Sequence, residues 1–151
     1  MTLPLKRDKR FKQGKYVPIN QDKFLGTEAI FRSGMELKFF RFCDNNPNVI
    51  KWGSENVKIP YYDTLKKKNR LYYIDNFVMI KEGNDIKRYL VEIKPFKQTQ
   101  VPKESKRKKK SNLLYEKIQY KNNCDKWESA KKYAKRAGME FIIITEKELN
   151  S

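Results

Sequence analysis

The chain has 151 residues and a formal net charge of +17. A cationic excess of this size is more than solubility requires and indicates a polyanionic partner, most simply nucleic acid, although RNA binding of the ribosomal type produces the same balance. The sequence contains no histidine, which excludes His-dependent nucleases, hydrolases with a Ser-His or Cys-His pair, and zinc fingers with His ligands. Any hydrolysis must therefore use carboxylates, lysine and a metal ion.

The length suits one domain, which we expect to span residues 27–151. The two cysteines, Cys43 and Cys124, have neither the number nor the spacing of a zinc site or a disulfide framework, so we expect reduced, buried thiols. No segment approaches the roughly 18 apolar residues of a membrane span, and the N-terminus has no apolar signal-peptide region. These features predict a soluble protein that is not secreted and has no membrane partner.

The first predicted segment is a basic arm, residues 1–26. Six of its cations lie between Lys6 and Lys15, and the segment has two prolines and almost no periodic apolar pattern. We expect the arm to lie outside the core, either as a solvated tail or as a contact to DNA.

A short amphipathic helix follows from Ser33 to about Asp44, where apolar residues recur at helical spacing. Glu36 in this helix has two interpretations. It occupies the third helical position after a Ser33 N-cap, as in a capping box whose carboxylate reaches back to the Ser33 amide. It also lies on a stripe with Phe40 and Cys43, beside the apolar face, and from there it could serve as a metal-site acid. The residues alone favour the cap.

The next elements are a turn, a strand and a loop. Asn45–Asn48 is rich in Asn and Pro and predicts the turn. Val49–Tyr61 has alternating apolar positions and predicts one strand, kinked near Gly53. Asp63–Asn69, with three consecutive lysines, predicts a basic loop that leads into the central part of the chain.

The central stretch predicts two strands, Leu71–Ile80 and Arg88–Pro95, because both are rich in β-branched and aromatic residues. Between them, Gly83-Asn84 suits a two-residue turn of the primed type. This turn fixes the register and places Asp75 directly opposite Glu92, with Cβ atoms roughly 4.5–5.5 Å apart.

Lys94 lies two residues after Glu92 and so shares its face of the sheet. Two carboxylates at this spacing could hold a divalent cation, Mg²⁺ or Mn²⁺, that activates water and stabilises phosphate charge, while the lysine positions the nucleophile. The alternative is the ordinary polar face of a half-solvated hairpin. Against this, directly opposed Asp75 and Glu92 repel unless a positive charge lies between them, and Lys94 could supply that charge.

Residues 101–111 predict a long cationic loop. Its cations are Lys103, Lys106, Arg107, Lys108, Lys109 and Lys110. Beside a metal site such a loop suits a phosphate backbone, and a flexible linker is the alternative.

The end of the chain predicts a helix and a strand. Asn112–Ala137 reads as a long helix that Gly138 ends, with a possible break near Asn122. The continuous apolar run Phe141–Ile144 predicts a strand buried on both faces, which the right-handed crossover rule places parallel to the Glu92 strand. The resulting order is one helix, three strands, one helix and one strand.

This αβββαβ order, with an acid in the first helix, Asp on the second strand and Glu-x-Lys on the third, resembles the PD-(D/E)xK nuclease core. The chain is also similar to the endonuclease subunit of heteromeric transposases, and more closely to the head-completion nucleases of contractile-tailed phages. The stretches that carry this resemblance are GKYVPIN (14–20), FRSGMELKFFRFCD (31–44), NVIKWGSE (48–55), KIPYYD (58–63), EIKPFKQT (92–99) and EFIIITEKEL (140–149). Ile74 replaces the motif's proline.

The resemblance implies an α/β fold of the restriction-endonuclease-like type, with a central mixed sheet flanked by helices. By motif it makes Glu36 the helix acid, Asp75 and Glu92 metal ligands, and Lys94 the catalytic lysine. It implies Mg²⁺- or Mn²⁺-dependent hydrolysis of packaged or protruding DNA before a phage tail joins the head. The implied partners are DNA and phage head or portal (connector) proteins, in the cytoplasm of the infected bacterial host or in the virion.

For the DNA contacts we expect Gln98 to line the site and residues 106–110 to hold the backbone. Two rival functions fit the same composition. One is a non-catalytic DNA-binding head or connector protein, and the other is an RNA-binding protein whose acids are structural.

Overall fold

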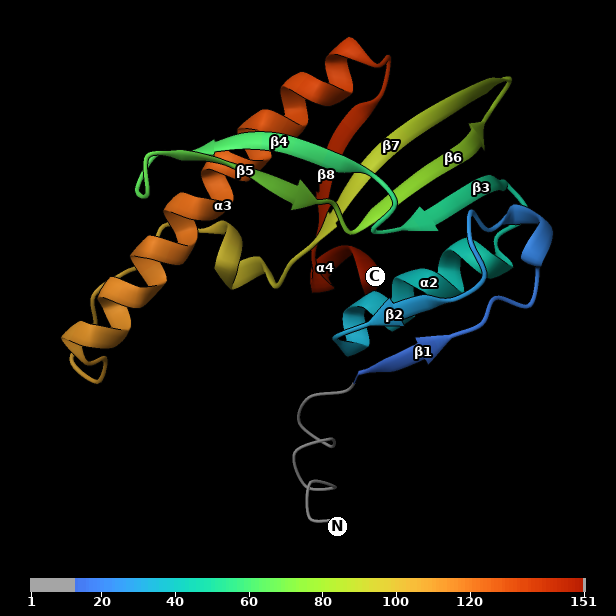
Figure 1. Cartoon of the computed structure of the whole chain (residues 1–151). Helices are drawn as coiled ribbons and strands as arrows, with labels where there is room; N and C mark the ends of the chain where they lie inside the picture. Colours follow the sequence, from blue (N-terminus) through green and yellow to red (C-terminus); the bar gives the residue numbers. More distant parts are fainter. Residues whose placement is uncertain (1–12, 151) are drawn as a thin grey trace.

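The computed structural model describes residues 13–150 (Figure 1). Its elements in order are β1 (Gly14–Tyr16), the 3-10 turn η1 (Gln21–Lys23), β2 (Ala29–Phe31), α2 (Gly34–Asn45), β3 (Val49–Ser54), β4 (Lys58–Asp63), β5 (Lys68–Tyr73), β6 (Asn76–Glu82), β7 (Asp85–Ile93), the 3-10 turn η2 (Phe96–Thr99), α3 (Lys110–Arg136), β8 (Glu140–Ile144) and α4 (Glu146–Leu149). No helix in residues 13–150 is long and apolar enough to cross a membrane.

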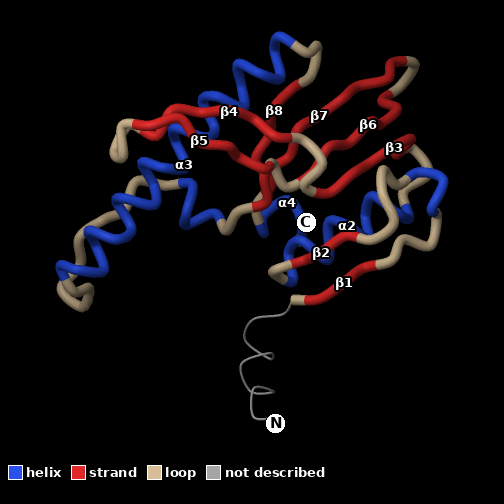
Figure 2. Tube along the Cα trace, viewed as in Figure 1, coloured by secondary structure: helices blue, strands red, loops and turns tan. Residues whose placement is uncertain are grey.

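A four-stranded sheet in the order β3-β6-β7-β8 forms the centre of the fold. The first three strands are antiparallel, and β8 runs parallel to β7, so the sheet is mixed. Helices cover both faces (Figure 2). One core joins α2 to the sheet through Phe40, Trp52 and Val91, and the other joins α3 through Trp127 and Leu90. The predicted mixed α/β fold is confirmed.

The β6–β7 hairpin has the predicted turn and register. Glu82 pairs with Asp85, so Gly83 and Asn84 form the two-residue turn, and Gly83 takes a φ of +62° that a side chain would disfavour. The ladder continues without a slip to the pair of Asn76 and Val91. A one-residue slip would turn every side chain of one strand to the other face of the sheet. This register therefore decides which residues of β6 and β7 lie opposite each other.

The last crossover also follows the prediction. α3 runs unbroken for 27 residues, so the possible break near Asn122 is absent. Its buried Trp127, Ala130 and Ala134 pack on the sheet, and β8 then pairs parallel with β7, with Glu92 aligned to Ile143.

Two predicted strands are each divided in the structure. The single strand expected at Val49–Tyr61 is β3 in the central sheet and β4 outside it, separated by Glu55 with a φ of +51°. The strand expected at Leu71–Ile80 divides near Asp75, and β5 leaves the sheet to pair with β4. Both predictions were wrong because the apolar alternation in the sequence continues across each bend. The bends themselves are produced by tertiary contacts.

The bends are held by contacts between them. Ile74 N donates to the Val57 carbonyl at 3.2 Å, and Glu55 N donates to the Asp75 carbonyl at 3.0 Å. The segment expected as a basic loop, Asp63–Asn69, is the tip of the resulting β4–β5 hairpin. This hairpin covers part of the α3 face of the sheet and brings Tyr72 into the core there.

The predicted basic arm needs a correction. Residues 1–12 lie outside the described residues, but residues 13–26 pack on the body of the protein. The Phe24 side chain is 7% exposed and lies 4.6 Å from Trp52 between ring centroids. The Tyr16 hydroxyl donates to the buried Asp44 carboxylate at 2.5 Å. Burial, followed by this hydrogen bond, raises the pKa of Tyr16 to about 12. Two isolated aromatic anchors leave no periodic pattern, so the sequence did not reveal them.

Candidate active site

Asp75 lies at the bend between β5 and β6, against the end of β7. Its Oδ2 accepts a hydrogen bond from Ile93 N at 2.7 Å. Since Ile93 follows Glu92 directly, this bond holds the Asp75 carboxylate beside Glu92 on one face of the sheet. The hairpin register therefore brings the two predicted acids together, although Asp75 itself has left the regular ladder.

Glu92 is buried, with 4% of its surface exposed. Its Oε1 accepts a hydrogen bond from the Tyr72 hydroxyl, which the β4–β5 hairpin supplies. Its Oε2 lies 3.6 Å from the Lys94 Nζ. Lys94 is fixed in turn by its amide, which donates to the Ile144 carbonyl of β8 at 3.0 Å. Asp75, Glu92 and Lys94 thus form one cluster.

The electrostatics of the cluster are those of a crowded acid pair. Burial raises the pKa of Asp75 well above its usual range, and the charge of Glu92 raises it further, while the Ile93 amide and Lys94 act in the opposite direction. Burial, followed by the Glu92 charge, also raises the pKa of Tyr72. Two carboxylates in such a place favour a positive ion between them.

The donor set fits a hard divalent cation. Mg²⁺ takes oxygen ligands and is commonly held by one or two carboxylates with water and substrate phosphates completing the shell. Asp75 and Glu92 supply two such carboxylates. In residues 13–150 no three acidic or sulfur side chains form a ready-made metal-binding group.

Glu36 stands at the edge of this cluster. Ser33 caps α2 by accepting from Glu36 N at 3.1 Å, as the sequence predicts. The carboxylate does not reach the Ser33 amide, because its Oε1 lies 3.3 Å from the Arg32 amide instead. Burial raises the pKa of Glu36, and the Glu36 charge contributes to the raised pKa of Asp75. Glu36 therefore acts on Asp75 electrostatically while its own contacts are those of a helix start.

Lys126 on α3 is a further cation near the cluster that was not among the residues expected from the sequence. Its Nζ lies 5.6 Å from the centroid of the Tyr72 ring and 6.0 Å from that of Tyr61. Burial and the charge of Lys94 lower the pKa of Lys126, and the charges of Glu92 and Asp75 oppose this. In the sequence, the adjacent Trp127 is the residue that could have indicated the position of Lys126, since it fixes which side of α3 meets the sheet.

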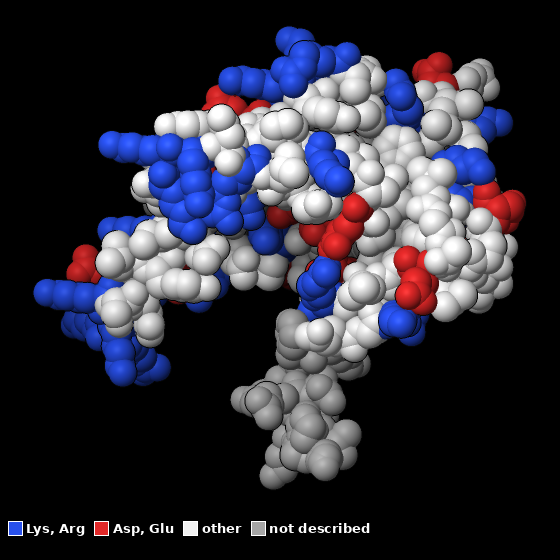
Figure 3. Space-filling model, viewed as in Figure 1, with Lys and Arg blue, Asp and Glu red and all other residues white. Residues whose placement is uncertain are grey.

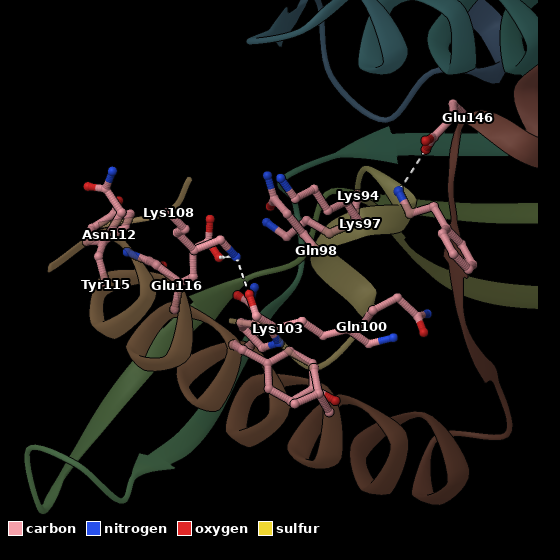
Figure 4. A pocket seen from close by; sticks show the side chains of 16 residues that line it. Lys94, Lys97, Gln98, Gln100, Lys103, Lys108, Asn112, Tyr115, Glu116 and Glu146 are labelled. Carbon is pink, nitrogen blue, oxygen red and sulfur yellow. Dashed lines mark hydrogen bonds and ion pairs between the residues drawn. The ribbon is translucent and has the colours of Figure 1, made fainter. Parts of the chain in front are cut away.

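A groove opens next to Lys94 (Figure 4). One side is formed by η2 and the segment that follows it, and the other side by the N-terminal half of α3. The groove has a volume of about 900 Å³, and Gln98 and Lys108 are among its lining residues. Lys108 is turned inward, with its Nζ 2.7 Å from both the Glu116 carboxylate and the Lys103 carbonyl.

The other loop cations have a different position. Lys106, Arg107, Lys109 and Lys110 are exposed and do not line the groove. Figure 3 shows Lys and Arg gathered over the β4–β5 hairpin and around the N-terminal end of α3. These four exposed cations thus lie outside the groove, whereas Lys94, Lys97, Lys103 and Lys108 line it.

The part of the chain that carries this site resembles known proteins. A family model for the N-terminal domain of TnsA-like endonucleases matches residues 46–146, a range that includes Asp75, Glu92 and Lys94 but not Glu36. The chain is also similar to the head completion nuclease of Enterobacteria phage T4, with 36% identity over 141 residues, which cover 88% of this chain and 90% of that protein.

Proposed function

The chain belongs to the family of TnsA-like endonucleases, and from this membership we propose that it is a Mg²⁺- or Mn²⁺-dependent deoxyribonuclease of the PD-(D/E)xK type. The observation that carries the proposal is the pairing of Asp75 with Glu92 in a place where burial raises the pKa of Asp75. A stable fold has no need for two such acids side by side. A divalent cation removes the conflict and can supply the water activation and charge stabilisation that assist phosphodiester hydrolysis.

Each residue of the cluster has a distinct part. Asp75 and Glu92 would hold the ion, which when bound acidifies water and offsets charge on the phosphate. The Tyr72 hydroxyl and Ile93 amide fix the two carboxylates in place. Lys94 orients the attacking water and adds positive charge where the phosphate becomes more negative. Glu36 supports the ion or a water from the edge of the cluster.

We infer a role in phage head completion from the named relative. There the enzyme would trim packaged or protruding DNA before the tail joins, in the cytoplasm of the infected host or in the virion, with head or portal proteins as partners. The exposed cations Lys106, Arg107, Lys109 and Lys110 would hold the DNA backbone. The domain responsible would span residues 27–151 together with the folded part of the preceding segment.

Incubation with supercoiled plasmid, with and without Mg²⁺, tests this proposal. The parent should convert the plasmid to nicked or linear forms only with the metal, and Asp75→Asn, Glu92→Gln and Lys94→Ala should each abolish conversion. Glu36→Gln should reduce the rate less than these variants. Asp85→Asn is the matched control, since Asp85 is an exposed acid of the same hairpin. Cleavage that survives both acid substitutions would contradict the assignment, and binding without cleavage by the parent would favour a structural head protein.

A further inference from the structure

The groove beside Lys94 starts at the cluster and leads away from it. Lys94, Gln98 and Gln100 lie along one side, and Tyr115 of α3 lies along the other (Figure 4). Gln119 and Tyr120 of α3 also line the groove. The first side is fixed to the body, because Phe96 N donates to Glu146 Oε1 at 2.7 Å and the Lys147 Nζ lies 3.4 Å over the Phe96 ring. The groove is therefore a built feature continuous with the site.

The charges that line the groove favour an anion. Its two acids are already engaged, Glu116 by Lys108 at 2.7 Å and Glu146 by the Phe96 amide. Lys97 and Lys103 line it as well and are exposed. Four lysines, Lys94, Lys97, Lys103 and Lys108, line the groove against these two acids, so an entering phosphate chain would meet a net positive charge.

The rest of the lining does not suit a double helix. Duplex DNA presents phosphates on its outside, which cations at the surface are sufficient to hold. This groove adds five side-chain amides and two tyrosines: Gln98, Gln100, Asn112, Gln119, Asn123, Tyr115 and Tyr120. Amides hydrogen-bond to base edges and aromatic rings stack on base faces, and both become accessible only when the strand is unpaired.

We propose that the groove binds a few nucleotides of an unpaired DNA strand adjoining the bond to be cut. The proposal rests on the proposed nuclease function, since it takes Lys94 as the point where the strand meets the site. Tyr115 is the stacking residue, because its side chain is 63% exposed at the groove and an exposed ring is free to take a base. The enzyme then acts on single strands, overhangs or frayed ends in preference to an intact duplex.

Fluorescence anisotropy in EDTA tests this without any cleavage. The probes are a labelled oligothymidylate and the same strand annealed to its complement. Tyr115→Ala should weaken binding of the single strand about tenfold, as loss of one stacked base does, and change duplex binding less than about twofold. Tyr115→Phe keeps the ring and should bind like the parent. Tyr62→Ala is the matched control, since Tyr62 is 50% exposed on β4 and does not line the groove.

Two outcomes would overturn the proposal. An unchanged affinity of Tyr115→Ala for the single strand would show that no base stacks there, and an equal loss for both probes would show that the groove holds backbone. Failure of the nuclease function has a different signature. In that case the plasmid would stay intact with the parent protein, while the protein would still bind the unpaired strand in preference to the duplex in the anisotropy assay.

Discussion

At the scale of single residues, the Asp75 carboxylate lies beside Glu92 where burial and a like charge both oppose its ionisation. Either a bound cation or a proton on the carboxylate relieves this unfavourable ionisation. The Asp75 pKa is raised in the folded protein, so the folded state binds this proton more tightly than the unfolded chain. The corresponding stability is present below the ordinary Asp pKa of 3.8 and is lost as the pH rises from there through the folded value.

Asp75→Asn should therefore leave the metal-free protein as stable as the parent or more stable at neutral pH, by up to about 1 kcal/mol. The asparagine oxygen can still accept from the Ile93 amide, so the bend is preserved. Near the ordinary Asp pKa the advantage should disappear. Thermal melts in EDTA across this pH range measure it, with Asp85→Asn as control. A large loss of stability at neutral pH would show that the ionised carboxylate stabilises the fold instead.

At the scale of elements, the Gly83-Asn84 turn and the α3–β8 crossover could be predicted from sequence, whereas the β4–β5 hairpin that leaves the central sheet before them could not. Gly83-Asn84 is a local signal, and it fixed the register that brings Asp75 to Glu92. The division of the strands depends on the hydrogen bond from Ile74 N to the Val57 carbonyl. Both residues lie in stretches whose apolar alternation is that of a continuous strand. Tyr72 then reaches Glu92 only because β5 leaves the sheet. No spacing in the sequence indicates such a partner.

Helix α3 adds a second cation, Lys126, and we expect it to assist cleavage. Its Nζ lies 5.6 Å from the Tyr72 ring centroid, and the charges of Lys94, Glu92 and Asp75 act on it, so it can help to attract a substrate phosphate to the cluster. Lys126→Met keeps the apolar stem and removes the charge, and should slow single-turnover cleavage at least about tenfold. DNA affinity in EDTA should change little.

Lys131→Met is the control for that variant, because Lys131 is an exposed lysine of the same helix. Equal rates for the parent and Lys126→Met would restrict Lys126 to packing over the two tyrosines.

At the scale of the whole molecule, the net charge of +17 predicted a polyanionic partner but not where it would lie. The structure distinguishes cations that the composition treats alike. Lys108 is tied to Glu116 and the Lys103 carbonyl, whereas Lys106, Arg107, Lys109 and Lys110 are exposed. This exposed set is available to replace the counterions of DNA, whereas the Lys108 ammonium is already paired.

Replacing the four exposed cations by Gln should therefore flatten the salt dependence of duplex binding. Each lost phosphate contact changes the slope of log K against log salt by about 0.9. Lys108→Gln should leave the slope nearly unchanged, since its ammonium already has partners. Anisotropy titrations at several salt concentrations measure both slopes. A flatter slope for Lys108→Gln alone would mean that its ion pair opens to bind DNA, and an unchanged slope for the fourfold variant would make the loop a spacer.

The claim that Asp75 and Glu92 form a divalent-metal site is tested most directly by thermal melts of the parent and Asp75→Asn, each in EDTA and in Mn²⁺. A ligand that binds only the folded state stabilises it by about 2.7 kcal/mol at a hundredfold excess over its dissociation constant. The parent should gain on this order, and Asp75→Asn should lose most of the gain. An equal metal-induced shift in the two proteins would show that Asp75 is not a ligand and would contradict the assignment of this metal site.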